Sequence, residues 1–422
     1  MGVENNIYEG WVETTLGNTC ELLDCLHRTP KYSNFGYPMV RVTDVKNGPL
    51  ETNGCLKVDV NTFNDFSKNY QPKIGDIVFT RVGSFGLSAI VKKEEQFCIG
   101  QNTTLILAKK INPFFLFYYL ISKAGRYQII ALSSGSTQPT ISMANIREIH
   151  FNLPPLPEQK AIAKVLTTFD DKIELLQAQN KTLETMAQTI FKEWFGKYQI
   201  GDDLPDGWRV GEFGEVIEFI NGYAFKSKDL SKEPIDNAYK VFKMGDINKG
   251  GGFKPGKTKG YYSKSMSTKL NKYILKNGDL LMSMTDMKDA ISLLGHTALM
   301  IYEDEYIVNQ RVGLIRAQND LNIEYPYLFL LTNNEDFIAG IRAGANSGVQ
   351  VNLSTQGIKE TEFIIADKET NKAFNNVVMP LFDKRKANSQ MIKELKKTRD
   401  TLLPKLMSGQ VRVNNIKQTA DA

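Results

Sequence analysis

Residues 153–162 read Leu-Pro-Pro-Leu-Pro-Glu-Gln-Lys-Ala-Ile, and no further proline occurs from Glu158 to Gly201. Proline is tolerated in the first turn of an α-helix but not in its interior, so this stretch predicts a helix start. Glu158 falls in the first turn, where a carboxylate suits the positive end of the helix dipole. Apolar residues then recur about every 3.5 residues, which predicts one long helix that pairs with another helix.

The contact face of this helix follows from the apolar spacing. Asn180 interrupts the series where an a-position residue belongs, and a single polar residue there is a known device for fixing register. A lone amphipathic helix packed on a domain core is the simpler alternative. We expect the helix-pairing residues to be Ile162, Leu166, Phe169, Ile173, Leu176, Asn180, Leu183 and Ile190.

Outward from this helix, the chain proves to be two copies of one unit of roughly 210 residues. Trp11 corresponds to Trp208, and Gly75-Asp-Ile-Val-Phe corresponds to Gly278-Asp-Leu-Leu-Met. Two copies are too few for a solenoid, so the repeat implies pseudo-twofold symmetry within one chain.

The second copy also ends in a long apolar pattern, from about Glu369 to Met407. It adds Leu395 and Leu402 as expected pairing residues, and Pro404 should kink or fray its end. Two long helices at matching places in a repeat favour an antiparallel coiled coil over two separate core helices.

The part of each copy that precedes its long helix is rich in short β-like runs separated by turn residues. Each copy also holds an aromatic run opened by a proline, Pro113 or Pro326, which predicts a short buried helix. We therefore predict an α+β fold, with two pseudo-twofold-related domains joined by two long antiparallel coiled-coil helices. The expected division is domain 1 at 1–152, helix 1 at 153–200, domain 2 at 201–366, helix 2 at 367–412 and a tail at 413–422.

Composition bounds the function only loosely. The 422 residues carry a net charge of +5, with 42% apolar and 23% charged residues, which is typical of a globular protein and not of a histone-like tail. No apolar run approaches the ~20 residues of a membrane helix, and the N-terminus has no signal core, so we expect a cytoplasmic protein.

The cysteines and histidines do not form a recognisable site. Cys20, Cys25, Cys55 and Cys98 lie far apart in sequence, and His27 is close to Cys25. Structural zinc prefers short paired spacings such as C-x2-C, so we expect reduced thiols and no metal site. We also find no paired carboxylates and no Ser-His-Asp order, so we expect no catalytic centre.

Positive charge is concentrated in two segments. Residues 240–276 contain ten lysines and one acid, Asp246, a local net charge of +9, with interleaved aromatic residues. Lysine among polar loop residues suits phosphate contact, whereas a solvated loop is the simpler alternative. The aromatic rings would pack either on sugars or on the sheet. Residues 384–405 carry eight bases and two acids, net +6, which would suit DNA backbone or an acidic partner.

One motif favours a different function. Residues 251–258 fit G-x-x-x-x-G-K-T, the phosphate-binding loop, which would make the chain a nucleotide-binding enzyme that uses Lys257 and Thr258. That loop works only between a buried strand and a helix. The residues that follow Thr258 show no helical apolar face, and the first copy has a plain turn at residues 47–54.

Several motifs together resemble the specificity subunit of type I restriction–modification systems. They are His27-Arg-Thr-Pro-Lys-Tyr, Tyr37-Pro-Met-Val-Arg-Val-Thr-Asp, Gly75-Asp-Ile-Val-Phe-Thr-Arg-Val-Gly, Ser134-Gly-Ser-Thr-Gln-Pro-Thr-Ile-Ser and the opening Leu153–Ile162 motif. The second copy departs from the pattern, because Ile364-Ile-Ala-Asp-Lys-Glu-Thr replaces the proline-rich helix entry.

The resemblance implies a sequence-specific DNA-binding subunit that is not itself an enzyme. Domains 1 and 2 would be target-recognition domains, each reading one half of a bipartite asymmetric site in double-stranded DNA. The helices would set the spacer and dock two modification (methyltransferase) subunits. S-adenosylmethionine would be bound by those subunits, and ATP by restriction subunits where present, with no cofactor in this chain. A coiled-coil scaffold that only recruits proteins is the remaining alternative.

Loops at matching positions of the two copies are the expected DNA contacts. Bidentate Gln or Asn on adenine and Arg or Lys on guanine are the specific contacts that such loops would make. The residues are Thr29, Lys31, Arg81, Ser84, Ser136, Thr137 and Gln138 in the first domain, and Lys226, Lys228, Lys254, Lys257, Lys259, Thr285, Lys288, Asn346 and Gln350 in the second.

Overall fold

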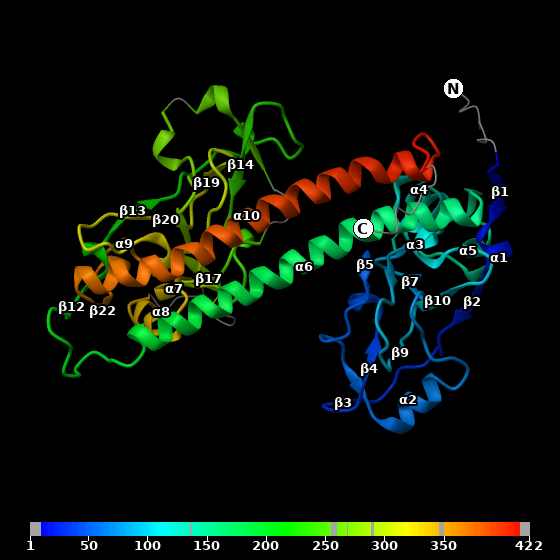
Figure 1. Cartoon of the computed structure of the whole chain (residues 1–422), viewed down its shortest axis with the longest axis horizontal. Coiled ribbons are helices and arrows are strands. Elements are labelled where there is room, and N and C mark those ends of the chain that lie inside the picture. Colours follow the sequence, from blue (N-terminus) through cyan, green and yellow to red (C-terminus); the bar gives the residue numbers. More distant parts are fainter. Residues whose placement is uncertain are drawn as a thin grey trace, which may run out of the picture. The chain divides into compact units, whose positions relative to one another are not determined.

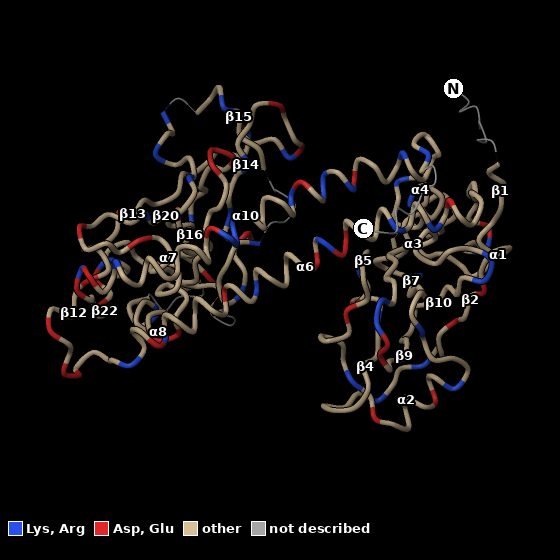
Figure 2. Tube along the Cα trace, viewed as in Figure 1, with Lys and Arg blue, Asp and Glu red and all other residues tan. Residues whose placement is uncertain are grey.

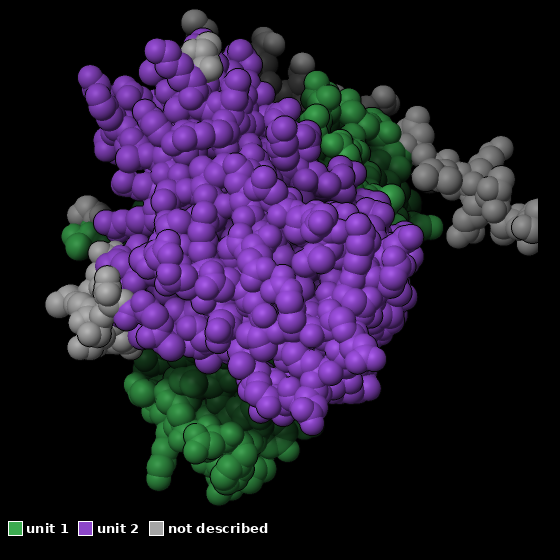
Figure 3. All heavy atoms as spheres, turned by 90° about the vertical axis from the view of Figure 1, so that its left-hand side faces the viewer, with its two compact units in different colours: residues 1–175, 391–422 green, residues 176–390 purple. Residues whose placement is uncertain are grey.

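The computed structural model of the chain describes residues 10–135, 137–254, 260–267, 269–287, 291–345 and 350–413. The chain divides into two compact units, unit 1 with residues 1–175 and 391–422, and unit 2 with residues 176–390 (Figure 3). Helices and sheets are mixed in both units, so the predicted α+β class is confirmed.

Two long helices contribute to both units: α6 (Leu156–Phe195) and α10 (Lys368–Met407) (Figure 1). Within unit 1, Glu158 of α6 contacts Arg412 and Asp170 contacts Arg399, so the two helices run in opposite directions. Within unit 2, the contacts of Asn180 with Asn388 and of Glu184 with Arg385 give the same direction. The predicted antiparallel pairing is therefore present within each unit.

The helix ends differ from those predicted. The first helix begins three residues after 153, because Leu153 belongs to strand β11, and it stops at Phe195, before a turn that starts at Gly196. The second helix contains Pro404 in its last turn and continues to Met407, so Pro404 does not end it early. It also contains Pro380, whose position inside the helix was not anticipated.

Unit 1 is built on a five-stranded sheet in the order β2-β10-β7-β8-β5 and a smaller sheet in the order β3-β6-β4-β9. A third sheet pairs β1 with β11 antiparallel. The strands are β1 (Val12–Thr15), β2 (Cys20–Asp24), β3 (Tyr32–Ser33), β4 (Tyr37–Val40), β5 (Gly48–Pro49), β6 (Lys57–Val58), β7 (Ile77–Thr80), β8 (Ser88–Ile90), β9 (Cys98–Ile99), β10 (Thr103–Ala108) and β11 (His150–Leu153), and the short helices are α1 (Leu16–Thr19), α2 (Val60–Phe66), α3 (Pro113–Ile121), α4 (Lys123–Ala131) and α5 (Met143–Arg147).

Unit 2 repeats the plan with a four-stranded sheet in the order β13-β20-β16-β18 and a β12-β22 pair. Two further sheets have the orders β15-β14-β19 and β17-β21. The strands are β12 (Arg209–Glu212), β13 (Ile217–Asn221), β14 (Ala238–Phe242), β15 (Tyr261–Ser263), β16 (Leu280–Ser283), β17 (Thr285–Met287), β18 (Thr297–Leu299), β19 (Tyr306–Val308), β20 (Val312–Ala317), β21 (Gln350–Asn352) and β22 (Glu362–Ile365), and the short helices are α7 (Tyr325–Leu331), α8 (Glu335–Ala343) and α9 (Thr355–Lys359).

The repeat is visible in side-chain contacts at the start of each long helix. In unit 1 the indole N–H of Trp11 donates to Glu158 (3.1 Å), and in unit 2 the indole N–H of Trp208 donates to Asp367 (3.0 Å). Asp367 also caps the first turn of α10 by accepting from the backbone N–H of Thr370. Asp367 thus bonds the tryptophan as Glu158 does in unit 1, and it also caps a helix start that lacks the proline-rich entry.

The core of each unit joins its sheet to the long helices. In unit 1, α3 packs between the large sheet and the helices, where Ile162, Leu166 and Leu406 are buried. In unit 2, Phe191 and Phe374 make the equivalent contacts with α7. Burial of a large apolar side chain contributes roughly 1.5–3 kcal/mol, so the long helices are part of each core rather than additions to it. Within the described residues, no helix is long and apolar enough to cross a membrane.

Candidate nucleic-acid interface

In unit 1 the loops that carry the predicted contacts converge on Arg81. Its guanidinium donates to Asp24 Oδ1 at the end of β2 (2.6 Å) and to the carbonyl of Ile141 (3.4 Å). The side chain of Arg81 is 18% exposed, so these bonds hold its orientation. Burial alone would raise the pKa of Asp24, but the hydrogen bond and charge of Arg81 outweigh it and hold that pKa below its usual value.

The loop that follows β2 presents Thr29 and Lys31, two of the predicted DNA contacts, to solvent. The amide of Gln101, with its oxygen turned toward this loop, accepts from the backbone N–H groups of Arg28 (3.2 Å) and Thr29 (3.3 Å). The backbone N–H of Arg81 donates to the neighbouring Asn102 carbonyl (2.8 Å). Residues around 24–29, 81 and 101 therefore form one connected surface.

One group in the described part of the chain has the spacing of metal ligands: Asp24, Cys25 and His27, whose polar atoms lie within 4.8 Å of one another. His27 Nε2 bonds Asp24 Oδ2 (3.1 Å), and burial together with the Asp24 charge raises the pKa of the Cys25 thiol. A thiolate is the form that binds metal, and the guanidinium of Arg81 already supplies the positive charge beside Asp24. The geometry at Asp24 favours the ion pair with Arg81 over a bound metal ion.

Ser84 lies exposed in the turn between β7 and β8. Thr80 Oγ1 donates to the Ser84 carbonyl (2.6 Å), and Arg126 of α4 donates to the carbonyls of Phe85 (3.1 Å) and Gly86 (2.7 Å). Gly86 has a φ of +71°, and a Cβ there would lie 2.5 Å from Ile129. The hydrogen bonds from Thr80 and Arg126 therefore hold the backbone of the turn, and this fixes the position of its exposed side chains.

Thr137 and Gln138 are exposed in the loop 133–141, while Ser136 lies outside the described residues. Ser134 and Thr140 close this loop with two backbone hydrogen bonds of 2.8 Å. A bridge between Val82 and Thr140 joins the loop to the segment that follows β7.

In unit 2 the segment that follows β16 is likewise joined to a distant segment, here through the pairing of two short strands, β17 and β21. Thr285 faces Asn352 and Met287 faces Gln350 in this antiparallel pair. Thr285 is only 7% exposed, and its hydroxyl contacts Met244 Sδ (3.4 Å), so it is a buried strand residue rather than the solvated loop residue expected. Lys288, Asn346 and the side chain of Gln350 lie outside the described residues.

Asp286 organises the segment that follows β17. Its carboxylate accepts from the backbone N–H groups of Met287 (2.9 Å), Ser292 (2.8 Å) and Leu293 (2.7 Å). Burial would raise the pKa of Asp286, yet these three donors lower it below its usual value. Asp286 thus joins the end of β17 to the backbone of Ser292 and Leu293.

The lysine-rich segment 240–276 contains the end of β14 and the whole of β15, and Figure 2 shows blue residues near both labels. Lys226 and Lys228 precede this segment. Lys226, Lys228 and Lys254 are exposed, whereas Lys257 and Lys259 lie outside the described residues. Other lysines are engaged: Lys264 Nζ lies 4.6 Å from the ring centre of Tyr239. Among the aromatic residues, Tyr239, Tyr262 and Phe242 are buried in the sheet, so these rings pack on the sheet rather than on sugars.

The phosphate-loop alternative lacks its required context. The glycines at 251 and 252 have φ values of +93° and +94°, and the next described element is strand β15, not a helix. Residues 255–259, which include Lys257 and Thr258, lie outside the described part. The described residues on either side of 255–259 provide no helix N-terminus to receive phosphate, so they give no support to a nucleotide-binding enzyme.

The predicted seam residues all belong to α6 or α10. Ile162, Leu166, Ile173 and Leu176 are buried, and Phe169, Asn180, Leu183, Ile190, Leu395 and Leu402 are half-buried. In unit 2, Asn388 is 1% exposed and its amide donates to Asn180 Oδ1 (3.0 Å), while Asn180 donates to Ser389 Oγ (3.1 Å). Asn180 therefore has a polar partner across the seam.

Sequence reasoning missed the residues that position these loops. The carboxylate of Asp24 accepts from Arg81, and that of Asp286 accepts from the backbone N–H of Ser292. The side chains of Gln101 and Arg126 bond backbone groups of neighbouring loops. Asp24 is the last residue of β2, whereas Asp286 is the middle residue of β17, so the two acids share no common sequence signal. The partners themselves come from distant segments, so no sequence spacing announces them.

Comparisons with known proteins agree with this architecture. The family model of the type I restriction modification DNA specificity domain matches residues 8–185 and again residues 205–397. The MjaIX specificity subunit of Methanocaldococcus jannaschii is 25% identical over 360 residues, covering 81% of this chain and 79% of that protein. The HindI specificity subunit of Haemophilus influenzae is 23% identical over 471 residues, covering 95% of this chain and 99% of that protein. The crystal structure of a type I S subunit from M. genitalium shares the fold, with a TM-score of 0.59 at 18% identity over 96% of this chain and 98% of that one.

Proposed function

This chain belongs to the type I restriction–modification DNA specificity family, and from that premise we propose that it reads double-stranded DNA as two half-sites, one with each unit. One observation carries the proposal. The segment after β7 pairs with the loop 133–141 at Val82 and Thr140, and the segment after β16 pairs with β21 at Thr285 and Asn352. The same construction occurs twice with different side chains, as a reader of two different sequences requires.

The side chains at these places suit the two parts of DNA recognition. Exposed lysines such as Lys226, Lys228 and Lys254 would contact phosphates and fix the register on the duplex. Gln138 and Thr137 would meet base edges in the major groove, where an amide can bond adenine in a bidentate manner. The surface formed by residues around 24–29, 81 and 101 would be the first reading surface. Arg81, held by Asp24, would position the residues of this surface.

The wider complex is part of the same proposal. Two modification subunits would dock on the long helices, bind S-adenosylmethionine and methylate adenine, and restriction subunits that use ATP would join them where present. This chain would contribute recognition and spacing, with no cofactor and no catalytic step of its own. The cytoplasmic location expected from the sequence remains a prediction.

A domain exchange tests the proposal. Residues 1–152 would be replaced by the same region of another specificity subunit, and methylated adenines would be mapped in the complex with its modification subunits. The expected result is a new sequence in one half of the site and an unchanged second half, with the reciprocal outcome for residues 201–366. A change in both halves would contradict the two-reader assignment, and methylation without sequence preference would favour the scaffold alternative.

A further inference from the structure

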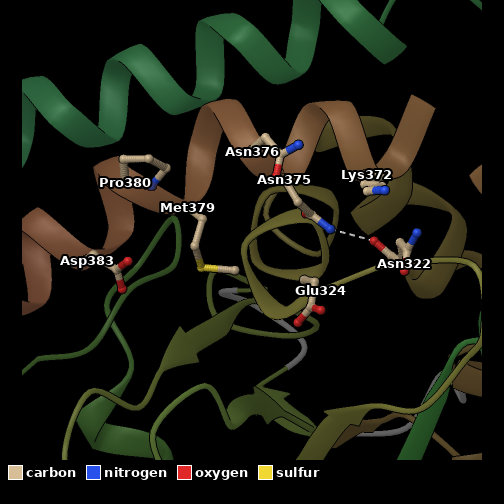
Figure 4. A pocket seen from close by; sticks show the side chains of 8 residues that line it. All are labelled: Asn322, Glu324, Lys372, Asn375, Asn376, Met379, Pro380 and Asp383. Atoms are coloured by element: carbon tan, nitrogen blue, oxygen red, sulfur yellow. Dashed lines mark hydrogen bonds between the residues drawn. The ribbon is translucent and has the colours of Figure 1, made fainter. Parts of the chain in front are cut away.

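Helix α10 has a gap in its hydrogen-bond ladder at Pro380. Proline has no backbone N–H, so the carbonyl of Asn376 loses the donor that residue i+4 normally supplies. A cavity of about 380 Å³ opens beside this point, between α10 and the loop that precedes α7 (Figure 4). We call this cavity the Pro380 notch, defined by Glu324, Asn375, Asn376, Pro380 and Asp383.

The notch contains acceptors that lack donors. Asn375 is 9% exposed, and its amide nitrogen donates to the carbonyl of Asn322, as the dashed line in Figure 4 marks. Its Oδ1 is buried and has no partner among the described residues. This Oδ1 is too enclosed for a ligand to reach. The acceptor that a ligand with N–H groups can bind is the carbonyl of the exposed Asn376, which Pro380 leaves without its helical donor.

The notch is also negative. Glu324 and Asp383 are exposed carboxylates, and neither forms an ion pair with another described residue. Lys372 is the one basic residue of the lining. Burial, together with the charges of Asp383 and Glu324, raises the pKa of the adjacent Tyr325 to about 12.

These features select the ligand. A phosphate backbone is excluded by the sign of the charge. A metal ion is disfavoured, because within the described residues the one group with metal-ligand spacing lies elsewhere, around Asp24. An arginine side chain brings a positive charge and five N–H donors on a flat group, for which Met379 and Pro380 provide an apolar wall. Asn376, Pro380 and Asp383 are exposed on α10, so a protein surface can reach them.

We propose that the Pro380 notch receives an arginine side chain of the modification subunit. This inference rests on the proposed function, which assigns that subunit to the long helices. It adds a specific docking point in unit 2 and the chemistry of the group that occupies it.

The test uses the purified full chain and the modification subunit of its own system, without DNA, with affinity measured by isothermal titration calorimetry. The double variant Glu324→Gln/Asp383→Asn should weaken the complex at least tenfold and reduce its salt dependence. Lys372→Gln should act in the opposite direction and tighten binding several-fold, because it removes a like charge. Glu394→Gln changes an exposed acid on the same helix outside the notch and should leave the affinity unchanged.

The outcomes separate this inference from the function on which it rests. If the wild type and the three variants bind the modification subunit with equal affinity, the arginine site at the Pro380 notch is wrong while the proposed function stands. A wild-type chain that binds no modification subunit would overturn both. A separate DNA titration in which the double variant loses DNA binding while its subunit binding stays intact would also overturn the notch. Circular dichroism and the melting temperature of each chain verify that the exposed substitutions leave the fold intact.

Discussion

At the scale of single residues, the contacts of Arg81 suit a positioning group for the DNA-reading surface proposed for unit 1. It bonds Asp24 and the Ile141 carbonyl at once, which a lysine cannot reproduce, because its ammonium lacks the planar fork. We predict that Arg81→Lys lowers affinity for the cognate site by about 1–3 kcal/mol and relaxes only the first half-site. DNA-binding titrations on sites randomised in one half at a time would measure this.

A double-mutant cycle distinguishes positioning from direct base reading. If Arg81 acts through its ion pair, Asp24→Asn should cost about as much as Arg81→Lys, and the double variant should cost little more. Additive losses would instead show that Arg81 contacts DNA independently of Asp24.

Asp286 gives a prediction about pH. Its folded-state pKa lies below the ordinary value of 3.8, so the carboxylate contributes stability above about pH 4, and this is lost as the pH falls through the folded-state pKa. Asp286→Asn should lower the free energy of unfolding by about 1–3 kcal/mol at pH 7, because an amide oxygen serves three backbone donors poorly. Urea denaturation at pH 7 and at pH 3 measures this, and the gap between wild type and variant should narrow at the lower pH. A constant gap would show that the charge of Asp286 does not matter.

At the scale of elements, the long helices were predictable and their details were not. The apolar spacing from Ile162 onward is a local property of the sequence, so it predicts a helix and its contact face without reference to the rest of the chain. Pro380 lies inside α10 because Phe374 and Phe382 of the same helix are packed in the core of unit 2. This packing outweighs the hydrogen bond that the backbone loses at Pro380. Thr285 is buried because β17 pairs with β21, more than sixty residues later, and such pairing leaves no signal in local sequence.

The polar contact in the helix seam supports a prediction of its own. Asn388→Leu would leave Asn180 Oδ1 without its donor, so the variant should lose roughly 1–3 kcal/mol in the free energy of unfolding. Asn180→Leu/Asn388→Leu removes both amides and should recover that loss, at the expense of register specificity. Thermal unfolding measures the stabilities, and a double variant no more stable than the single one would show that this pair does not act as a unit.

At the scale of the whole molecule, the net charge of +5 conceals an uneven distribution of lysines, and this distribution gives a prediction about DNA binding. Residues 240–276 carry a net +9, and Lys249, Lys254 and Lys269 are exposed among them. Removing one lysine that neutralises a phosphate should reduce the slope of log affinity against log salt by about 0.9. Replacing these three lysines by glutamine should therefore reduce the slope by up to about 3 and weaken binding equally on cognate and unrelated duplexes. Fluorescence anisotropy at several salt concentrations measures both effects. If the slope stays constant, these lysines face solvent in the complex, and the charge that drives association must come from elsewhere, with residues 384–405 on α10 as the next segment to change.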